Sequence, residues 1–289
     1  MALAGPRDAM VRVAILGLGS IGGSIALDLF RVHEVRGFDP DPASCAAAAA
    51  AGIPVCGTPE QALAGAELAV LCAPLGRLPA LVEALAPHVD AGAIVTDVGG
   101  VKSPVVKAGR RLLPGAFVGG HPMAGSTGHG FVAARTGLFV DAPWALTPGG
   151  RDEQEAAARV RQVLAPTGAR FFECDPESHD RAVAFTSHVP YLMSVAIARA
   201  ALGARDEGLT EVSELVGPGF RDVTRLAMTP VQLGHDMAFE NRDAVLAALA
   251  ALRHQIAQAE VLLQNDLESA FATWSEGAAT WRAALSLPQ

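Results

Sequence analysis

The sequence predicts a mixed α/β domain followed by an all-α C-terminal domain. Short apolar runs alternate with helical segments up to Cys174, which is typical of a sheet wrapped by helices. A glycine-rich turn follows the first apolar run, and after Cys174 no segment has the character of a strand. A chain of 289 residues is long enough for two domains. We expect these domains at residues 1–174 and 175–289.

The first half of the chain predicts a parallel sheet, because parallel strands need crossover connections and these are usually helices. Two helices are expected at Ile21–Arg31 and Ala43–Ala51. Strands are expected at Val11–Leu16, Glu34–Asp39, Leu68–Ala73, Ala93–Asp97, Phe117–Gly119, Trp144–Thr147 and Arg170–Glu173.

The second half predicts long helices, at Asp180–Leu202 and Arg242–Leu263. In the second of these, apolar residues recur in alternating steps of four and three, which places them in one stripe on a helix. The stripe consists of Val245, Leu249, Leu252, Ile256, Ala259 and Leu263. Such a stripe belongs either to the core of the domain or to contacts with a second subunit, and the pattern leaves both readings open.

Composition excludes several classes of function. The net charge of −8 argues against a nucleic-acid-binding surface, which needs lysine and arginine to neutralise phosphates. No run reaches the ~18–20 apolar residues of a membrane span, and Met1–Asp8 lacks the apolar segment of a signal peptide. The four cysteines are scattered without a Cys-x-x-Cys pair, so neither disulfides nor a metal site are expected. We therefore expect a cytoplasmic protein whose partner is a small molecule.

The turn Gly17-Leu18-Gly19-Ser20-Ile21-Gly22 predicts a Rossmann-type dinucleotide site, since a strand precedes it and a helix follows it. Gly17 allows the tight turn, Gly19 lets the backbone approach a pyrophosphate at the helix start, and Gly22 permits close packing of helix on strand. Ser20 and Ile21 belong to the same binding turn.

Asp39 ends the next strand 22 residues after Gly17, close to the spacing of the acid that binds the ribose 2′-hydroxyl. A carboxylate there would repel the 2′-phosphate of NADP, so the sequence favours NAD. Ala73 ends the third expected strand and Pro74 follows it. Both are expected to line the cofactor crevice, although a plain strand terminator fits the same spacing equally well.

His121 follows a short apolar strand in a loop rich in glycine and proline. A dehydrogenase needs a base near the nicotinamide, and imidazole suits this task because its pKa lies near working pH. A lone histidine in a loop is more often a surface or structural residue. The other histidines outside the motifs below are read in that way, and they are His33, His88, His129, His179, His235 and His254.

Four segments together resemble the prephenate/arogenate dehydrogenase family, in order and at similar intervals between Val11 and Asn241. They are Thr96–Lys102, Gly119–Gly125 (Gly-Gly-His-Pro-Met-Ala-Gly), Ser187–Tyr191 and Gly219–Arg225. The resemblance implies NAD-dependent oxidative decarboxylation of prephenate to 4-hydroxyphenylpyruvate in tyrosine biosynthesis. The alternative is arogenate, or both substrates as in a cyclohexadienyl dehydrogenase. The resemblance also implies a homodimer, and the reaction that it implies requires no metal.

The resemblance assigns roles to particular residues. His121 would be the catalytic residue, and Arg225 would bind a substrate carboxylate, a task that suits its forked guanidinium. Ser187 and Tyr191 would line the substrate pocket. His188 falls in the same motif, where a role in packing or capping is as plausible as a role in binding.

Two positions depart from the family pattern. Gly100, expected beside the nicotinamide, stands where the family often has a serine that would hydrogen-bond near the catalytic histidine. Tyr191 stands where many relatives carry histidine, and it is the only tyrosine of the chain. These departures leave the choice between the keto acid and the amino acid open.

Three other functions are alternatives to this one. A β-hydroxyacid dehydrogenase uses a catalytic lysine in its helical domain, whereas this sequence has no lysine after Lys107. A reductase that makes proline or pantoate would not need His121 in this loop. A dinucleotide-sensing module without catalysis is the third, and NAD reduction upon addition of prephenate would eliminate it.

Overall fold

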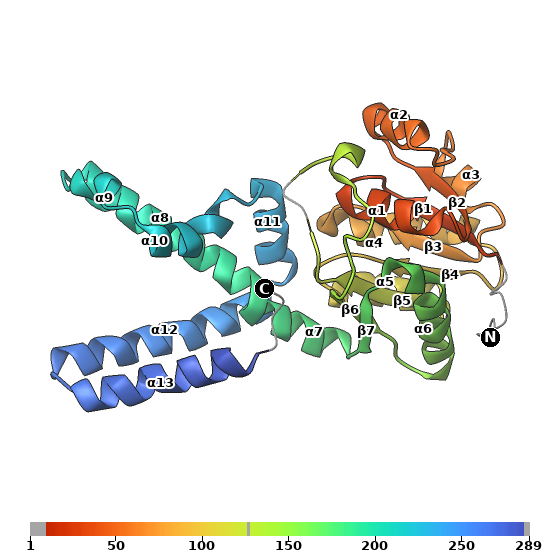
Figure 1. Cartoon of the computed structure of the whole chain (residues 1–289). Coiled ribbons are helices and arrows are strands. Elements are labelled where there is room, and N and C mark those ends of the chain that lie inside the picture. Colours follow the sequence, from red (N-terminus) through yellow and green to blue (C-terminus); the bar gives the residue numbers. More distant parts are fainter. Residues whose placement is uncertain (1–9, 126–127, 286–289) are drawn as a thin grey trace, which may run out of the picture.

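A computed structural model describes residues 10–125 and 128–285. It has a sheet-containing body formed by the first part of the chain and a group of helices formed by the second part (Figure 1). The predicted fold class, a Rossmann-type α/β domain followed by an all-α domain, is confirmed. The interpretation of Met1–Asp8 concerns residues outside the described ranges.

The body is built on one seven-stranded sheet in the order β2-β1-β3-β4-β5-β6-β7. Strand β1, which lies between β2 and β3, is apolar after Arg12 and almost fully buried, as expected for a parallel strand covered on both faces. The strands are β1 (Arg12–Leu16), β2 (Glu34–Phe38), β3 (Leu68–Leu71), β4 (Ile94–Asp97), β5 (Phe117–Pro122), β6 (Pro143–Thr147) and β7 (Arg170–Glu173).

The sheet is not parallel throughout, which corrects the sequence-based expectation. Strands β1 to β5 run parallel, but β6 is antiparallel to β5, with Gly120 opposite Leu146. Between these two strands the described residues hold only the short 3₁₀ turn Phe131–Ala133, so there is no crossover helix to return the chain in the parallel direction. β7 is again parallel to β6, and α6 (Arg151–Leu164) makes that crossover.

Helices cover both faces of the sheet, because alternate side chains of a strand point to opposite faces. Val13 and Ile15 of β1 pack in one core cluster with α1 (Ser20–Leu29) and α6. Ala14 and Leu16 pack in the other with helices on the opposite face. Those helices are α3 (Pro59–Leu63), α4 (Leu78–Leu85) and α5 (Ser103–Leu112); α2 (Pro42–Ala50) follows β2.

The C-terminal part is helical from Pro176 onward within the described residues. The predicted helix at 180–202 starts earlier, because the Asp175 side chain caps α7 (Pro176–Val183) by accepting from the backbone N–H of Ser178 at 2.8 Å. A π-type turn, Ala184–His188, separates α7 from α8 (Val189–Asp206). The remaining helices are α9 (Glu211–Glu214), α10 (Pro218–Thr224), α11 (Val231–Glu240), α12 (Arg242–Gln264) and α13 (Glu268–Ala284).

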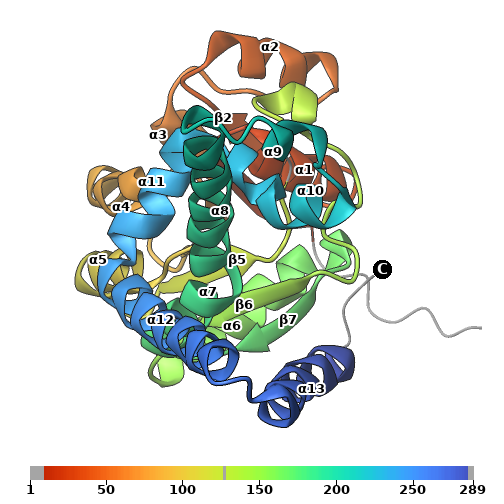
Figure 2. The same cartoon turned by 90° about the vertical axis from the view of Figure 1, so that its left-hand side faces the viewer.

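Helices α12 and α13 form a hairpin that projects from the body (Figures 1 and 2). The predicted apolar stripe of α12 is part of a core only near its start: Val245 is 4% exposed, whereas Ile256 is 43% and Leu263 66% exposed. In the described part of the chain, no helix combines the length and the apolar character needed to cross a bilayer.

Candidate active site

The predicted cofactor residues gather at the carboxyl edge of the sheet. Gly17 follows β1, Asp39 follows β2 and Gly100 follows β4, all strands of the parallel part. Ala73 and Pro74 follow β3 at the same edge, with Ala73 half-buried and Pro74 exposed. In open α/β sheets this edge is where ligands bind.

The glycine turn requires the residues it has. Gly17 has φ = +107°, a conformation that L side chains rarely adopt, and a Cβ there would overlap the carbonyl oxygen of Cys72. A Cβ on Gly22 would overlap the carbonyl oxygen of Gly17. Gly19, by contrast, has open space where its Cβ would be, in front of the first turn of α1. The turn is therefore tightly packed behind and open in front, where a pyrophosphate would lie.

Asp39 is fixed beside this turn. Its carboxylate accepts hydrogen bonds from the backbone N–H groups of Leu18 (2.6 Å) and Asp41 (2.8 Å). Ser20 opens α1, and its hydroxyl donates to the carbonyl of Ala133 at 3.3 Å, which ties the β5–β6 connection to the cofactor turn. Ile21, in the same turn, is half-buried.

His121 lies within β5, not in a loop as its sequence context suggested. The strand continues to Pro122, and His121 pairs with Ala145 of β6. An ideal Cβ on Gly100 would lie 3.6 Å from Nε2 of His121, and beyond residues 99–101 only the His121 ring comes within 4 Å of it among the described residues. Gly100 and His121 are therefore neighbours, as the family motif implies, and the edge of the ring that carries Nε2 and Cε1 faces Gly100.

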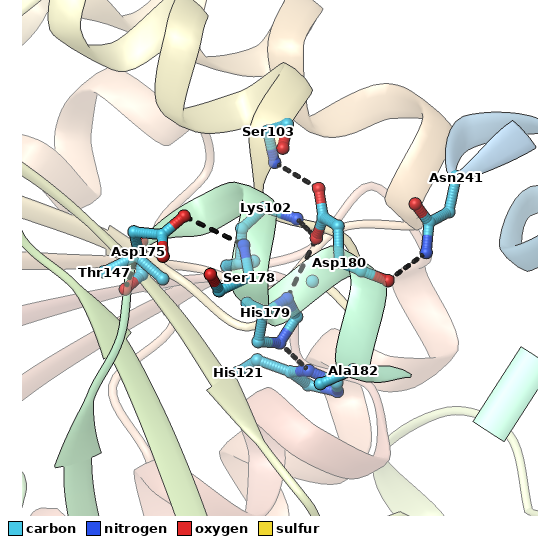
Figure 3. A network of polar contacts seen from close by, with 12 residues as sticks. Lys102, Ser103, His121, Thr147, Asp175, Ser178, His179, Asp180, Ala182 and Asn241 are labelled. Atoms are coloured by element: carbon cyan, nitrogen blue, oxygen red, sulfur yellow. Dashed lines mark hydrogen bonds and ion pairs between the residues drawn. The ribbon is translucent and has the colours of Figure 1, made fainter. Parts of the chain in front are cut away.

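The other ring nitrogen of His121 is held by a second histidine. Nδ1 of His121 lies 2.8 Å from Nε2 of His179 on α7 (Figure 3). His179 is 4% exposed, which excludes a surface position and leaves the structural role as the reading that applies. Nδ1 of His179 in turn lies 2.9 Å from Oδ1 of Asp180.

Asp180 connects this chain to the body of the protein. Its carboxylate accepts the backbone N–H groups of Lys102 (2.7 Å) and Ser103 (2.8 Å), at the start of α5 (Figure 3). Burial alone would raise the pKa of the Asp180 carboxyl. The hydrogen bonds from His179, Ser103 and Lys102 outweigh that effect, so its pKa lies below its usual value and the group is a carboxylate.

A buried ion pair fixes the backbone next to His121. Lys102 and Asp97 are both 0% exposed and contact each other through Nζ and Oδ2. The Lys102 ammonium also donates to the carbonyl of Gly120 (2.7 Å), while Asp97 accepts the N–H of Gly120 (3.1 Å). Both backbone groups of Gly120 are thus held by one ion pair, directly before His121.

These surroundings keep His121 neutral. Burial penalises its charged form most, and the neighbouring basic side chains of His179, Lys102 and His188 disfavour an added positive charge further, so the pKa of His121 lies well below 6.5. Nε2 has no hydrogen-bond partner among the described residues, and a neutral imidazole with such a nitrogen is able to accept a proton.

His188 ends the π-type turn and is 2% exposed. Asn241, which is also buried, donates through its side-chain amide to the carbonyl of Asp180 (2.7 Å) and lies 3.1 Å from Nδ1 of His188. Since the amide nitrogen can only donate, Nδ1 of His188 is the acceptor and its proton is on Nε2. Burial lowers the pKa of His188 to about 4, so it is a neutral donor.

The other predicted substrate residues lie around this turn, and no hydrogen bond among the described residues connects them to His121. Ser187 belongs to the π-type turn, with its hydroxyl 3.9 Å from Sδ of Met237. Tyr191, on α8, places its hydroxyl against Gly234 of α11. Arg225 opens the 3₁₀ turn Arg225–Met228 and is exposed.

A nucleotide-binding sheet with a base at its carboxyl edge and a helical domain beside that edge is the architecture of nicotinamide-dependent dehydrogenases. Comparison with known families makes this specific. The nucleotide-binding domain of prephenate dehydrogenase matches residues 25–173, and the dimerization domain of prephenate dehydrogenase matches residues 175–275. The chain belongs to the prephenate dehydrogenase family.

Individual relatives agree with this assignment. Prephenate dehydrogenase of Bacillus subtilis is 32% identical over 244 residues, which is 81% of this chain but 65% of the relative, so the match spans less than two thirds of that protein. Cyclohexadienyl dehydrogenase of Zymomonas mobilis is 30% identical over 82% of this chain and 83% of its own length.

Solved structures agree as well. Arogenate dehydrogenase of Synechocystis superposes with a TM-score of 0.85 at 34% identity and covers 94% of this chain and 98% of its own. Prephenate dehydrogenase of A. aeolicus, solved with hydroxyphenyl propionate and NAD+, has a TM-score of 0.87 at 25% identity, with 95% and 98% covered.

Proposed function

We propose that the protein is an NAD-dependent dehydrogenase that oxidatively decarboxylates prephenate to 4-hydroxyphenylpyruvate. Residues 1–174 would bind the cofactor, and residues 175–289 would complete the substrate site and the dimer. One observation carries this proposal: a neutral His121, held through Nδ1, directs Nε2 toward Gly100 at the cofactor edge of the sheet. Membership of the family supports the choice of substrate.

The residues at the carboxyl edge fit NAD. Gly17 and Gly22 hold the turn, and Gly19 leaves the start of α1 open for the pyrophosphate. Asp39 is positioned to bind the ribose hydroxyls, and with Asp41 two residues on, the site is acidic and would repel a 2′-phosphate. Ser20, Ile21, Ala73, Pro74 and Gly100 would complete the cofactor contacts. The proposal is therefore NAD in preference to NADP.

NAD, when bound, takes up the hydride that leaves the ring carbon bearing the hydroxyl. The task of His121 is to accept the hydroxyl proton at Nε2 as that hydride departs. The ring carboxylate then leaves as CO2, and the electrons of its C–C bond make the ring aromatic. Aromatisation drives the reaction, so the protein has to align the reacting groups rather than supply a strong acid or a metal.

Three kinds of group are proposed to hold the substrate. Arg225 would pair with a carboxylate of the substrate side chain. His188, a neutral donor, and Ser187 would supply hydrogen bonds from the π-type turn. The phenol of Tyr191 would lie at the side-chain end of the pocket, and we propose that it takes part in the choice between a keto and an amino group.

Arogenate is the second candidate substrate, because an arogenate dehydrogenase and a cyclohexadienyl dehydrogenase stand among the similar proteins. The deciding experiment measures NADH formation with prephenate and arogenate side by side, first with NAD and then with NADP. Turnover of prephenate with NAD supports the proposal, and turnover of arogenate alone changes the substrate. Reduction with neither substrate refutes dehydrogenase activity and supports a dinucleotide-sensing module.

Two variants test the residue roles. His121→Asn should lower kcat by about 10²–10⁴-fold, the range typical for loss of a general base, while NAD binding measured by calorimetry stays within a factor of about two. Arg225→Ala should raise KM for prephenate more than it lowers kcat. A near-wild-type kcat in the first variant, or an unchanged KM in the second, contradicts the respective role.

We further propose a homodimer formed by the helical domain. Its helices expose large apolar side chains, among them Leu215 (82%) and Met228 (87%). Exposure of such side chains to water is unfavourable, and contact with a second subunit would bury them. An open apolar groove of about 400 Å³ lies between α8 and α12. Its lining residues are Phe185, Val189, Pro190, Met193, Ala248, Ala251, Leu252 and Gln255.

Light scattering coupled to size-exclusion chromatography tests this assembly. A mass of twice 29.7 kDa supports the homodimer, and a monomer at micromolar concentration contradicts it. The cytoplasmic location expected from the sequence agrees with the four free cysteines and stays a prediction.

A further inference from the structure

In the proposed reaction, the base accepts one proton from the substrate and later transfers one proton back to it. The substrate hydroxyl gives up its proton as hydride leaves the same carbon. When CO2 departs, the ring oxygen becomes a phenolate and takes a proton back. No net proton is released, so the base needs a place to keep one proton for the length of the reaction rather than a path to solvent. This step rests on the proposed function.

The hydrogen bonds around Asp180 have only one consistent direction. The backbone N–H groups of Lys102 and Ser103 can only donate, and they point at the Asp180 carboxylate (2.7 and 2.8 Å). That carboxylate therefore accepts from Nδ1–H of His179 at 2.9 Å. Nε2 of His179 then carries a lone pair and accepts from Nδ1–H of His121 at 2.8 Å. This order leaves Nε2 of His121 unprotonated and ready to accept.

We propose that His121 and His179 act together as the base. While the enzyme holds the substrate's proton, His179 carries the positive charge. As Nε2 of His121 accepts the hydroxyl proton, the Nδ1 proton of His121 moves to Nε2 of His179. His121 is then neutral again, and His179 is an imidazolium beside the Asp180 carboxylate. When the phenolate forms, the two shifts reverse, and the proton returns to the ring oxygen. Only N–H and O–H bonds change, and Asp180 stays ionised throughout.

Burial and charge support this assignment. The side chains of His179 and Asp180 are only 3% and 7% exposed, so the charge stays in the protein. The ionisable groups that act on His121 are His179 from α7, Lys102 before α5 and His188; Asp97 of β4 contacts Lys102, and Asp180 of α7 contacts His179. Lys102 and Asp97 neutralise each other, and His188 is neutral. Asp180 is thus the remaining negative charge that can stabilise an imidazolium, and it touches His179.

The first test reads the tautomers directly and needs neither cofactor nor substrate. In full-length protein labelled with ¹⁵N-histidine, His121 and His179 should both show a protonated Nδ1 and an unprotonated Nε2 at neutral pH. Spectra of His121→Asn and His179→Gln assign the signals. A proton on Nε2 of His121 in the wild-type protein would overturn the proposal.

The second test is kinetic and uses His179→Gln, because the glutamine carbonyl can still accept from Nδ1–H of His121 but cannot take up its proton. In single turnovers the hydride-transfer rate should fall by about 10²-fold or more. The acid limb of kcat/KM should move to lower pH, since Asp180 no longer strengthens the base. The proton inventory in H2O/D2O mixtures should change from curved, with two protons moving, to linear. His33→Gln, a buried histidine between Val11 and Val163, is the matched control and should leave all three unchanged.

The outcomes separate the two levels of the proposal. If the wild-type enzyme oxidises neither prephenate nor arogenate, the proposed function fails, whatever the tautomers are. If the wild-type enzyme turns over and His179→Gln slows it with the pH limb and proton inventory unchanged, His179 only supports the fold and the two-histidine base is refuted. A rate equal to that of the wild type refutes it as well.

Discussion

Replacing Lys102 with methionine would expose how much the protein depends on its buried ion pair. Methionine has a similar length and no charge, so it fills most of the same space. Among the described residues, the change leaves the fully buried Asp97 carboxylate with two backbone donors, Gly99 N–H (2.8 Å) and Gly120 N–H (3.1 Å). It also leaves the Gly120 carbonyl without the ammonium that it now accepts from.

The expected loss of stability follows from these contacts. Removing one partner of a buried ion pair costs ~3–5 kcal/mol, because the remaining charge is uncompensated. The unpaired carbonyl adds about 1 kcal/mol, and the two surviving donors to Asp97 offset a similar amount. We therefore expect Lys102→Met to lower the free energy of unfolding by about 4 kcal/mol, on the order of 10 °C in Tm for a chain of this size.

Urea denaturation followed by circular dichroism, at one fixed protein concentration, measures this loss. The double variant Asp97→Asn/Lys102→Met should recover at least half of it, because no uncompensated charge remains. Lys107→Met, an exposed lysine on α5, is the control and should change stability by less than ~0.5 kcal/mol. A loss below ~1 kcal/mol in Lys102→Met, or a double variant less stable than the single one, would refute this reasoning.

Three other predictions concern the cofactor turn, the buried histidine and the family departure. Gly22→Ala puts a Cβ onto the carbonyl oxygen of Gly17, so NAD affinity measured by calorimetry should fall at least about tenfold; unchanged affinity contradicts the tight packing. Because the folded-state pKa of His188 is about 4 against 6.5, its contribution is complete above pH ~6.5 and is lost as pH falls toward 4, by about 3 kcal/mol. His188→Gln should therefore show a shallower loss of stability over that window, and parallel curves would contradict this. Gly100→Ser fits without displacement, since its Cβ lies 3.6 Å from Nε2 of His121. The variant should keep its Tm, and a hydroxyl donating to Nε2 should move the acid limb of kcat/KM to lower pH; an unmoved limb argues against the contact.

Local chemistry made the cofactor turn predictable from sequence. Gly17 and Gly22 are where backbone conformation and close packing leave room for no side chain, and the turn that they require is built from six consecutive residues. The proximity of Gly100 to His121 was also predictable, because the family motif implies it. The direction of β6 was not predictable in this way, because it depends on the connection between β5 and β6, whose described residues form no crossover helix, and strand patterns do not report this.

His179 shows where sequence reasoning stops. It is 58 positions from His121, and nothing in Pro-Glu-Ser-His-Asp at the start of α7 indicates that its ring meets a histidine on β5. A histidine followed by an aspartate after the last strand is the only signal available, and it is common. Asn241 is similar, since its amide reaches Asp180 and His188 only once α12 is packed against α7.

The hydrogen bonds between Asp180 and the start of α5 restrict how the two domains can move. One carboxylate joins the helical domain to the body and, through His179, sets the proton on His121. A rigid-body rotation of α7 away from α5 would break these bonds. His121 would then no longer be held in the tautomer that leaves Nε2 unprotonated. If the two domains separated at this contact, His121 would no longer be an effective base. Any hinge motion that admits ligands must therefore keep the hydrogen bonds between α7 and the start of α5.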